Sequence, residues 1–386
     1  MDRVNCTTAQ IVSGKRKFKD GTIPPASFFN QVQEELMYCI ESTGITPKKW
    51  DTSQVLQSIY ANIPPKIYDN FKSHAIIEVW KQCYNSKDVV INNICWSGQI
   101  FVAVGSLHAG DADAYIMTSP DGINWTERAN PSNLILYGVC WSGSLFVAVG
   151  AAAADAYIIT SPNGINWTER ANPVPATLFG VCWSPFLSLF IAVGDDDGFD
   201  TYITTSPDGI TWTERLSPTV SNLYSVCSSN SLIVSVGHND GIDALIATST
   251  NGITWLERSN PKNFALESVC WSPSLSLFVA VGAADGTDAY IVTSPDGINW
   301  TERANPKNIE LKGICWSSAF NFFIAVGAAD GVDAYVITSP DGITWTERAN
   351  PKNIELRGVC SSDSLFVAIG SFDITDSYIL NSLRCY

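Results

Sequence analysis

A short segment, "TSPDGINWTER" at Thr118–Arg128, recurs five more times along this 386-residue chain with few changes. The tryptophans of the six copies lie 42, 45, 43, 45 and 45 residues apart; they are Trp125, Trp167, Trp212, Trp255, Trp300 and Trp345. A period of this length is typical of repeat architectures, in which each unit packs only against its neighbours. The repeat therefore constrains the fold more than any other feature of the sequence.

Each unit contains four strand-like runs, which Gly, Pro, Asp and Asn separate. In one unit they are "LESVCWS", "LSLFVAVG", "DAYIVTS" and "INWTER". Their Val, Ile, Tyr and Thr residues favour pleated strands, and the units lack the amphipathic helical stretches that a helical solenoid would need. Four short antiparallel strands, repeated around an axis, predict the blades of a β-propeller.

The spacing of Trp and Cys predicts the number of blades. In every complete unit a Cys follows the Trp by 15 residues, and Cys95 follows Trp80 in the same way, although the Trp80 segment has no turn motif. At the other end Tyr378 matches Tyr157, and the chain stops near the point where a turn would come. We predict an all-β, seven-bladed propeller whose last blade is completed by the strand around Trp80. This closure leaves no exposed sheet edge.

The recurring turn is Ser-Pro-Asp-Gly-Ile-(Asn/Thr)-Trp, and it resembles the Asp-box, or bacterial neuraminidase repeat. The usual Asp-box has one residue between Asp and Gly, whereas here they are adjacent. The resemblance covers residues 74–386 and implies a propeller in which the box is structural. The acidic position holds Asp121, Asp208, Asp296 and Asp341, with Asn163 and Asn251 in two copies. Because an amide replaces the carboxylate twice, we predict turn-forming side chains rather than catalytic or metal-binding ones.

A second set of acidic residues ends the variable loops that precede the third strand of each unit. These are Asp113, Asp155, Asp200, Asp243, Asp288, Asp333 and Asp376. They form a candidate binding ring for cations or a basic partner. The alternative, which we favour, is that each Asp caps its own loop.

Seven of the 11 cysteines occupy one position on the first strand: Cys95, Cys140, Cys182, Cys227, Cys270, Cys315 and Cys360. We predict small thiols that pack between blades. Cys83 and Cys385 fall near the place where the two ends of the repeat region are predicted to pair. They could form a disulfide there or remain two free thiols. The Glu-Arg pair after each turn, from Glu127 and Arg128 onward, is predicted to lie on the outer strand and to discourage edge-to-edge association.

The charge of the chain is concentrated in the repeat region. The net charge is -15, and residues 71–386 hold 15 Lys and Arg against 31 Asp and Glu. Such a surface repels phosphate backbones, so we expect no nucleic-acid partner. Apolar runs are too short for a membrane span, and the N-terminus lacks the apolar core of a signal peptide. We therefore expect synthesis in a cytoplasm and no membrane insertion. We also expect no cofactor and no metal.

The N-terminal part, residues 1–70, is predicted to form a separate attachment segment with two short helices. Phe28, Phe29, Val32, Leu36 and Ile40 follow near-helical spacing, and Gly44 would end that helix. A second helix is expected over Thr52–Asn62. Two such helices cannot bury a core alone. They must therefore dock on the propeller (residues 71–386), on a second copy or on another protein.

This segment resembles one found in phage and prophage tail-fibre proteins, "GT…FFN.VQEEL…IE..GI…..D..QLLQAI". The matching residues are Gly21, Thr22, Phe28–Asn30, Val32–Leu36, Ile40, Glu41, Gly44, Ile45, Asp51 and Gln54–Ile59. The resemblance implies attachment to a phage tail or baseplate through the N-terminal part, with the C-terminal module presented outward. The propeller departs from the intertwined fibre of those proteins, which puts trimerisation in doubt.

Taken together, these features predict a structural virion protein of a tailed phage, located in the tail. Its partners would be tail or baseplate proteins through residues 1–70, and a host surface polysaccharide or receptor through the propeller. We expect no enzyme activity. One alternative is a sialidase-like glycan hydrolase, but in the propeller only Arg357 and Arg384 fall outside the repeated Arg positions, and a sialidase needs three clustered Arg. Another is a cellular assembly factor, similar to the propellers of photosystem assembly. Those proteins carry a secretion or transit signal and a basic patch, and we find neither feature in this sequence.

Overall fold

The computed structural model describes residues 80–83, 89–106, 115–132, 134–151, 156–172, 176–196, 201–218, 220–239, 244–284, 286, 289–372 and 377–382. The chain divides into two units, and all of these residues belong to the second, Ile76–Cys385. The N-terminal segment predicted over residues 1–70, with its two helices, lies outside the described residues. Within the described ranges there are strands and turns but no helix, and hence no helix able to span a membrane.

Each blade begins with a strand near the axis of the ring. These inner strands are β2 (Ile91–Trp96), β6 (Ile135–Trp141), β10 (Leu178–Ser184), β14 (Leu223–Ser228), β18 (Leu266–Ser272), β22 (Leu311–Ser317) and β26 (Leu356–Ser361). The second strands follow directly. They are β3 (Phe101–Gly105), β7 (Phe146–Ala151), β11 (Leu189–Asp196), β15 (Ile233–Asn239), β19 (Leu277–Ala284), β23 (Phe322–Ala329) and β27 (Phe366–Phe372).

The third strands are fully buried wherever their burial is described. They are β4 (Ile116–Ser119), β8 (Ala156–Ser161), β12 (Thr201–Ser206), β16 (Ala244–Ser249), β20 (Ala289–Ser294), β24 (Ala334–Ser339) and β28 (Ser377–Ser382). Short outer strands complete the blades. They are β5 (Thr126–Arg128), β9 (Thr168–Arg170), β13 (Thr213–Arg215), β17 (Leu256–Arg258), β21 (Thr301–Arg303), β25 (Thr346–Glu347) and β1 (Trp80–Cys83).

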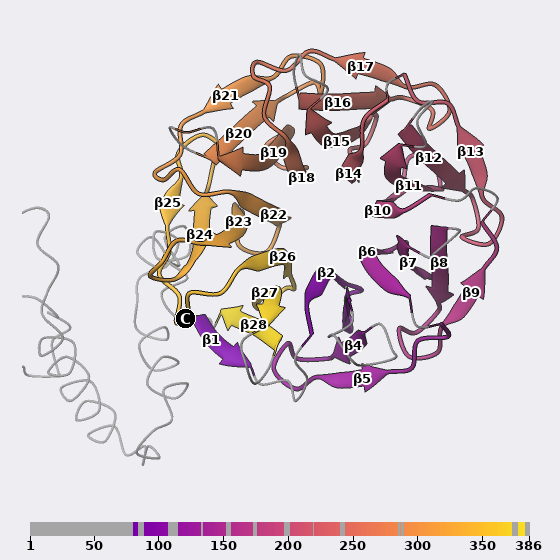
Figure 1. Cartoon of the computed structure of the whole chain (residues 1–386), viewed down its shortest axis with the longest axis horizontal. Coiled ribbons are helices and arrows are strands. Elements are labelled where there is room, and N and C mark those ends of the chain that lie inside the picture. The colour runs from indigo at the N-terminus through magenta and orange to yellow at the C-terminus, as the bar shows by residue number, and fades with distance from the viewer. Residues whose placement is uncertain are drawn as a thin grey trace, which may run out of the picture. The chain divides into compact units, whose positions relative to one another are not determined.

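The strands form seven antiparallel four-stranded sheets arranged around a central axis (Figure 1). Six sheets use four consecutive strands, whereas the seventh has the order β1-β28-β27-β26. In this last sheet Trp80 pairs with Ser382 and Cys83 with Ile379. The predicted seven-bladed propeller, closed by strands from the two ends of the repeat region, is therefore confirmed.

The hydrophobic core consists of seven clusters, each between two neighbouring blades. One contains Trp80 and Tyr378 from the last blade and Ile324 from the blade before it. Another joins Cys83 and Ile379 of the last blade to β2 and β3 of the first, which closes the ring. Burying one such large side chain contributes about 1.5–3 kcal/mol, so the repeated apolar positions explain why the blades pack as a ring.

Polar bonds also link the blades. Tyr157 on a third strand donates its hydroxyl to Oδ1 of Asn130, which follows the outer strand of the preceding blade, at 2.6 Å. Tyr378 makes the same bond to Asn350 at 3.0 Å. The Tyr of the "DAYI" run and the Asn of the "ERAN" run therefore belong to one repeated contact between blades.

Candidate functional site

The six predicted turns are held by side-chain oxygens. Asp121 Oδ1 accepts hydrogen bonds from the backbone N–H groups of Ile123 and Asn124 at 2.9 and 2.8 Å, and Ser119 Oγ accepts one from Gly122 N at 2.9 Å. In the second copy, Asn163 Oδ1 accepts the equivalent bonds from Ile165 and Asn166 at 2.9 and 3.0 Å. An amide and a carboxylate thus accept the same bonds, which supports the predicted turn-forming role.

The hydrogen bonds also set the acidity of these carboxyls. At Asp208, the backbone N–H groups of Thr211 and Ile210 lower the pKa of the carboxyl. At Asp121, burial acts to raise the pKa, but the bonds from Asn124, Ile123 and Ser119 outweigh it and bring the pKa to about 2. The carboxylates at these two turns are therefore stabilised as turn acceptors in their charged form.

Of the seven predicted loop aspartates, only Asp333 falls among the described residues; Asp113, Asp155, Asp200, Asp243, Asp288 and Asp376 lie outside them. Asp333 Oδ2 accepts a bond from the backbone N–H of Asn350 at 3.0 Å, within its own blade. At this position the structure therefore shows a carboxylate that binds a local backbone group.

One acidic cluster lies beside Asp333. Oxygen atoms of Asp330, Asp333 and Glu347 lie within 4.8 Å of one another. The ammonium of Lys307 is bonded to Asp330 at 2.7 Å and also to Glu347. A cation from the chain itself is thus bound to two of the three carboxylates.

The repeated Arg of the outer strands is fixed by its neighbour strand. Arg128 Nε donates to Thr118 Oγ1 at 2.8 Å, and Arg170 does the same to Thr160 at 2.8 Å. The four later copies repeat the bond at 2.9 Å; they are Arg215, Arg258, Arg303 and Arg348. These guanidinium groups therefore tie outer to third strands and are not clustered in one site.

The cysteines of the inner strands are free thiols, and each packs against a core cluster. Burial raises the pKa of Cys182 and of Cys360 to about 12. Cys83 is also free and donates from Sγ to the carbonyl of Gly122 at 3.4 Å; Cys385 lies outside the described residues. Thiols with such raised pKa values are poor nucleophiles.

A feature that sequence reasoning missed lies on the inner strands. All seven pairings of inner with second strands have an irregularity at the same place, one residue after the repeated Leu or Ile. The unpaired residues are Asn92, Tyr137, Phe179, Tyr224, Glu267, Lys312 and Arg357. Bulges of this kind bend a strand and re-aim a side chain. We call these seven residues the bulge ring.

The bulge ring lines the central channel. A cavity of about 610 Å³ is enclosed by residues from all seven inner strands, and all seven bulge residues belong to its wall. Figure 1 shows these strands around the middle of the ring. Leu136, next to Tyr137, pairs with Gly150 near the end of β7, whereas Phe146 at the start of β7 pairs with Ser161, where the turn begins. The bulge ring and the turns therefore lie at opposite ends of the blades.

One side of the bulge ring is aromatic. The rings of Tyr137 and Phe179 meet edge to face with centroids 5.4 Å apart, and those of Phe179 and Tyr224 do so at 5.6 Å. Tyr224 also meets His238 at 6.3 Å. The three bulge aromatics are only partly buried. We call Tyr137, Phe179 and Tyr224 the aromatic arc.

The other side is charged. Lys312 Nζ lies 2.7 Å from Glu310 and 3.9 Å from Glu267, and Arg357 Nε lies 2.6 Å from Glu355. We call these five residues, with Asn92, the charged arc. Arg357 also donates to Asn92 Oδ1 at 3.4 Å, and Asn92 Nδ2 donates to the Leu136 carbonyl at 2.8 Å. The charged arc thus runs through Asn92 to the blade that carries Tyr137.

Burial shifts one carboxyl of this arc. It raises the pKa of Glu267, and the nearby charges of Glu310 and Glu355 act in the same direction, while Lys312 and His238 act against it. The bulge ring therefore combines apolar faces with polar groups held in place by one another. Ligand sites typically have this composition.

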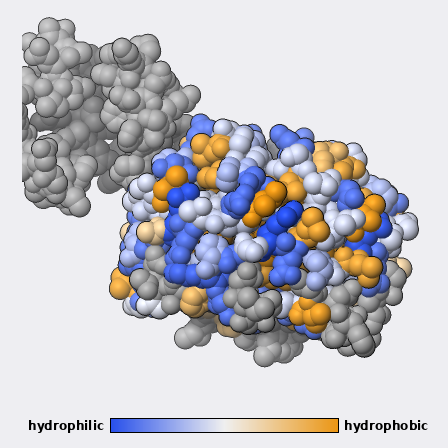
Figure 2. Space-filling view, turned by 90° about the horizontal axis from the view of Figure 1, so that it is seen from above, coloured by the Kyte–Doolittle hydropathy of each residue, from blue (hydrophilic) through white to orange (hydrophobic). Residues whose placement is uncertain are grey.

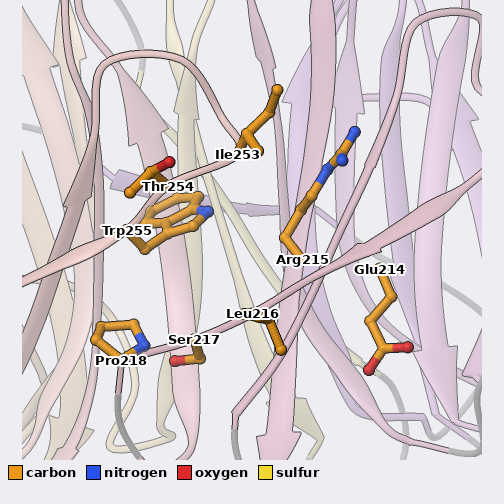
Figure 3. A pocket seen from close by; sticks show the side chains of 8 residues that line it. All are labelled: Glu214, Arg215, Leu216, Ser217, Pro218, Ile253, Thr254 and Trp255. Atoms are coloured by element: carbon orange, nitrogen blue, oxygen red, sulfur yellow. The ribbon is translucent and has the colours of Figure 1, made fainter.

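A second hollow lies between neighbouring outer strands (Figure 3). It has a volume of about 450 Å³ and is lined by Glu214–Pro218 and Ile253–Trp255. Leu216 is 80% exposed there, and Arg215 is bonded to Thr205. On the face shown in Figure 2, hydrophobic residues are scattered among hydrophilic ones rather than gathered in one patch. The wall of the channel at the bulge ring combines aromatic, acidic, basic and amide side chains from seven strands, whereas this hollow is lined by two short segments. The bulge ring is therefore the stronger candidate site.

No family model matches this sequence, and no curated protein matches it either. Solved structures do match its fold. One described as YCF48 bound to D1 peptide has a TM-score of 0.60 at 15% identity, covering 79% of this chain and 94% of that one. Virginiamycin B lyase from Staphylococcus aureus has a TM-score of 0.64 at 15% identity, covering 79% and 99%.

A third similar structure is the GH74 enzyme of Niastella koreensis, with a TM-score of 0.59 at 15% identity. The match covers 78% of this chain but 55% of that enzyme. These proteins differ in activity, and the identities are low, so the likeness establishes the β-propeller fold alone. A propeller supports many functions, and the function must be argued from the site.

Proposed function

We propose that this chain is a non-catalytic binding protein of a tailed-phage particle. Residues 1–70 attach it to the tail or baseplate, and the propeller binds a host surface or another tail protein. The tail-fibre-like motifs between Gly21 and Ile59 support the attachment role. The closed ring supports the second role, because it presents one rigid, singular site on an otherwise repeated scaffold.

The observation that carries the binding function is the bulge ring. Around it the blades are nearly alike, whereas the unpaired positions hold aromatic, acidic, basic and amide side chains in turn. Structural roles that all blades share, such as strand pairing, do not require different side-chain types at the unpaired positions. A constant scaffold with seven varied, convergent positions suits selective recognition of one ligand per ring.

Binding is favoured over hydrolysis because the described thiols are protonated at neutral pH and the described Arg and Lys side chains discussed above are already bonded to neighbouring residues. The described cysteines of the inner strands have raised pKa values, and the repeated arginines are bonded to threonines on the neighbouring strand. Lys312 and Arg357 are paired with carboxylates. A sialidase-like mechanism would need a cluster of free guanidinium groups, whereas the described wall of the channel contains one arginine, Arg357.

The test is to locate the chain in purified particles. Mass spectrometry should find it at a fixed copy number, and antibodies against the propeller should label the tail. A version lacking residues 1–70 should fold but be missing from particles. Absence of the full chain from particles would contradict the phage role. Reproducible release of product from sialosides or host polysaccharide would contradict the non-catalytic role.

The alternative of a cellular assembly factor has one point in its favour, since the similar structure of YCF48 is described with a bound peptide. If the chain is cellular, it should co-purify with an assembling complex in cells that release no particles. The particle experiment therefore separates the two roles.

A further inference from the structure

The bulge ring is nearly neutral as a whole. Glu267 of the ring carries a carboxylate, and Lys312 and Arg357 carry cations; the charged arc adds two further carboxylates beside the ring, on Glu310 and Glu355. Each cation already has a carboxylate partner within 2.7 Å. A strongly charged ligand would be attracted by one member of each pair and repelled by the other, so the pairs favour a ligand without net charge.

The aromatic arc provides a different kind of surface. Tyr137, Phe179 and Tyr224 hold one another in edge-to-face contacts, so their orientation is fixed before a ligand arrives. All three remain partly exposed in the channel wall. Such pre-ordered rings can pack against the C–H face of a ligand without much loss of side-chain entropy.

The two arcs together match a ligand with an apolar face and an edge of hydroxyl groups. From this arrangement we propose that the bulge ring binds one neutral sugar unit of a glycan. The C–H face of the sugar packs on the aromatic arc, and its hydroxyls bond to the carboxylate, amide and cationic groups of the charged arc. The proposal rests on the binding function above and names its ligand class.

The singular nature of the site limits how the glycan is bound. Only one aromatic arc and one charged arc exist among the described inner strands. A channel of about 610 Å³ suits one or a few sugar units rather than a polymer wrapped around the ring. The ring therefore recognises a chain end or a branch, not a repeating backbone along seven equivalent blades.

The test uses the full-length protein on an array of neutral and acidic glycans, with calorimetry on the best trisaccharide. Neutral glycans should bind best. Phe179→Leu, which keeps apolar bulk but removes the aromatic face, and Glu267→Gln should each weaken binding about tenfold or more. Ile165→Ala, in a turn at the opposite end of a blade, should leave binding unchanged. Thermal unfolding of each variant verifies that it is folded.

Two outcomes would overturn the proposal. One is the absence of any neutral glycan ligand, including the case in which a peptide array instead yields binders that depend on Phe179. The other is glycan binding that survives both Phe179→Leu and Tyr224→Leu. Either result leaves the location of the chain in particles untouched. Failure of the glycan site and failure of the phage role are therefore distinguishable.

Discussion

Lys81 lies directly opposite Asn381, in the register that Thr168 keeps with Thr160 inside an uninterrupted blade. Lys81 follows Trp80, and Thr168 follows Trp167, the Trp at the same repeat position. A strand from the start of the repeat region thus takes the position that a turn-connected strand takes elsewhere. The last blade is therefore held by pairing and packing between the two ends of the repeat region, without a turn.

The first prediction concerns Trp80, which is 5% exposed within a core cluster. Trp80→Ala should lower the free energy of unfolding by about 3–5 kcal/mol, because it leaves a large cavity. Trp167→Ala, at the equivalent position of an internal blade, is the matched control and should cost a similar amount. Denaturant unfolding measures both. A Trp80 variant as stable as the parent would show that this strand is not part of the ring.

The second prediction concerns acid stability. The pKa of Asp208 is lowered by backbone N–H groups, and that of Asp121 falls from 3.8 to about 2. A lowered carboxyl pKa contributes stability above its ordinary value, and this contribution is lost as the pH falls through the folded value. Asparagine does not titrate. Replacing Asp121, Asp208, Asp296 and Asp341 by Asn should therefore flatten the fall in Tm between about pH 4 and pH 2.

The exposed Asp363 lies outside the six turns, so Asp363→Asn removes a carboxylate without changing a turn and is the control for this experiment. The fourfold variant should keep the backbone bonds that Asn163 makes, but it should be less stable than the parent at pH 7, because it lacks the charged carboxylates and the bond that Asp121 Oδ2 accepts from Asn124 Nδ2. An identical acid limb in parent and fourfold variant would refute the linkage.

The third prediction concerns the backbone opposite a bulge. A Cβ on Gly150 would lie 1.8 Å from the carbonyl oxygen of Ile135. Gly150→Ala must therefore move the inner strand, and it should cost about 1–3 kcal/mol of stability. Gly143→Asn is the contrasting change, since its Cβ meets nothing within 4 Å and its cost is limited to backbone strain at a φ of 99°, which Asn bears better than most residues. Equal Tm values for the two variants would contradict the tight approach.

The fourth prediction concerns thiol reactivity. Burial raises the pKa of Cys182 from 9.0 to about 12. The thiolate fraction at pH 8 should then be about a thousandfold smaller than that of an ordinary thiol. Iodoacetamide should label this residue slowly in the folded protein and rapidly in guanidinium chloride, as followed by peptide mass spectrometry. Rapid labelling in the folded state would contradict the raised pKa of this thiol.

The sequence predicts much of this fold because its strongest signals are local and repeated. The spacing of Trp125, Trp167 and their later counterparts determines the blade, and the 15-residue step from Trp80 to Cys95 reveals the divided one. Each signal repeats in several units, so a single substitution, such as Asn163 for Asp, does not hide it.

The bulge ring was not predicted, because its residues differ from one unit to the next. Tyr137, Glu267 and Arg357 look like unrelated substitutions when units are compared for what they share. What they share is that each has no partner on the neighbouring second strand. This property depends on the strand register and cannot be read from the sequence of one strand alone. A signal was available, since this position follows the repeated Leu and ranges from aromatic to acidic to basic. Variation at one fixed repeat position is therefore as informative as repetition.

The closure of the ring can be tested with a disulfide between its first and last strands. Cys83 lies opposite Ile379, and both belong to the same core cluster. In a Cys385→Ser background, the thiol introduced by Ile379→Cys should therefore form a disulfide with Cys83 under mild oxidation, detected by mass spectrometry of the linked peptides. The same background without the Ile379 substitution should form none. A Cys83 that stays free, or that pairs with another cysteine, would contradict a ring joined between its first and last strands.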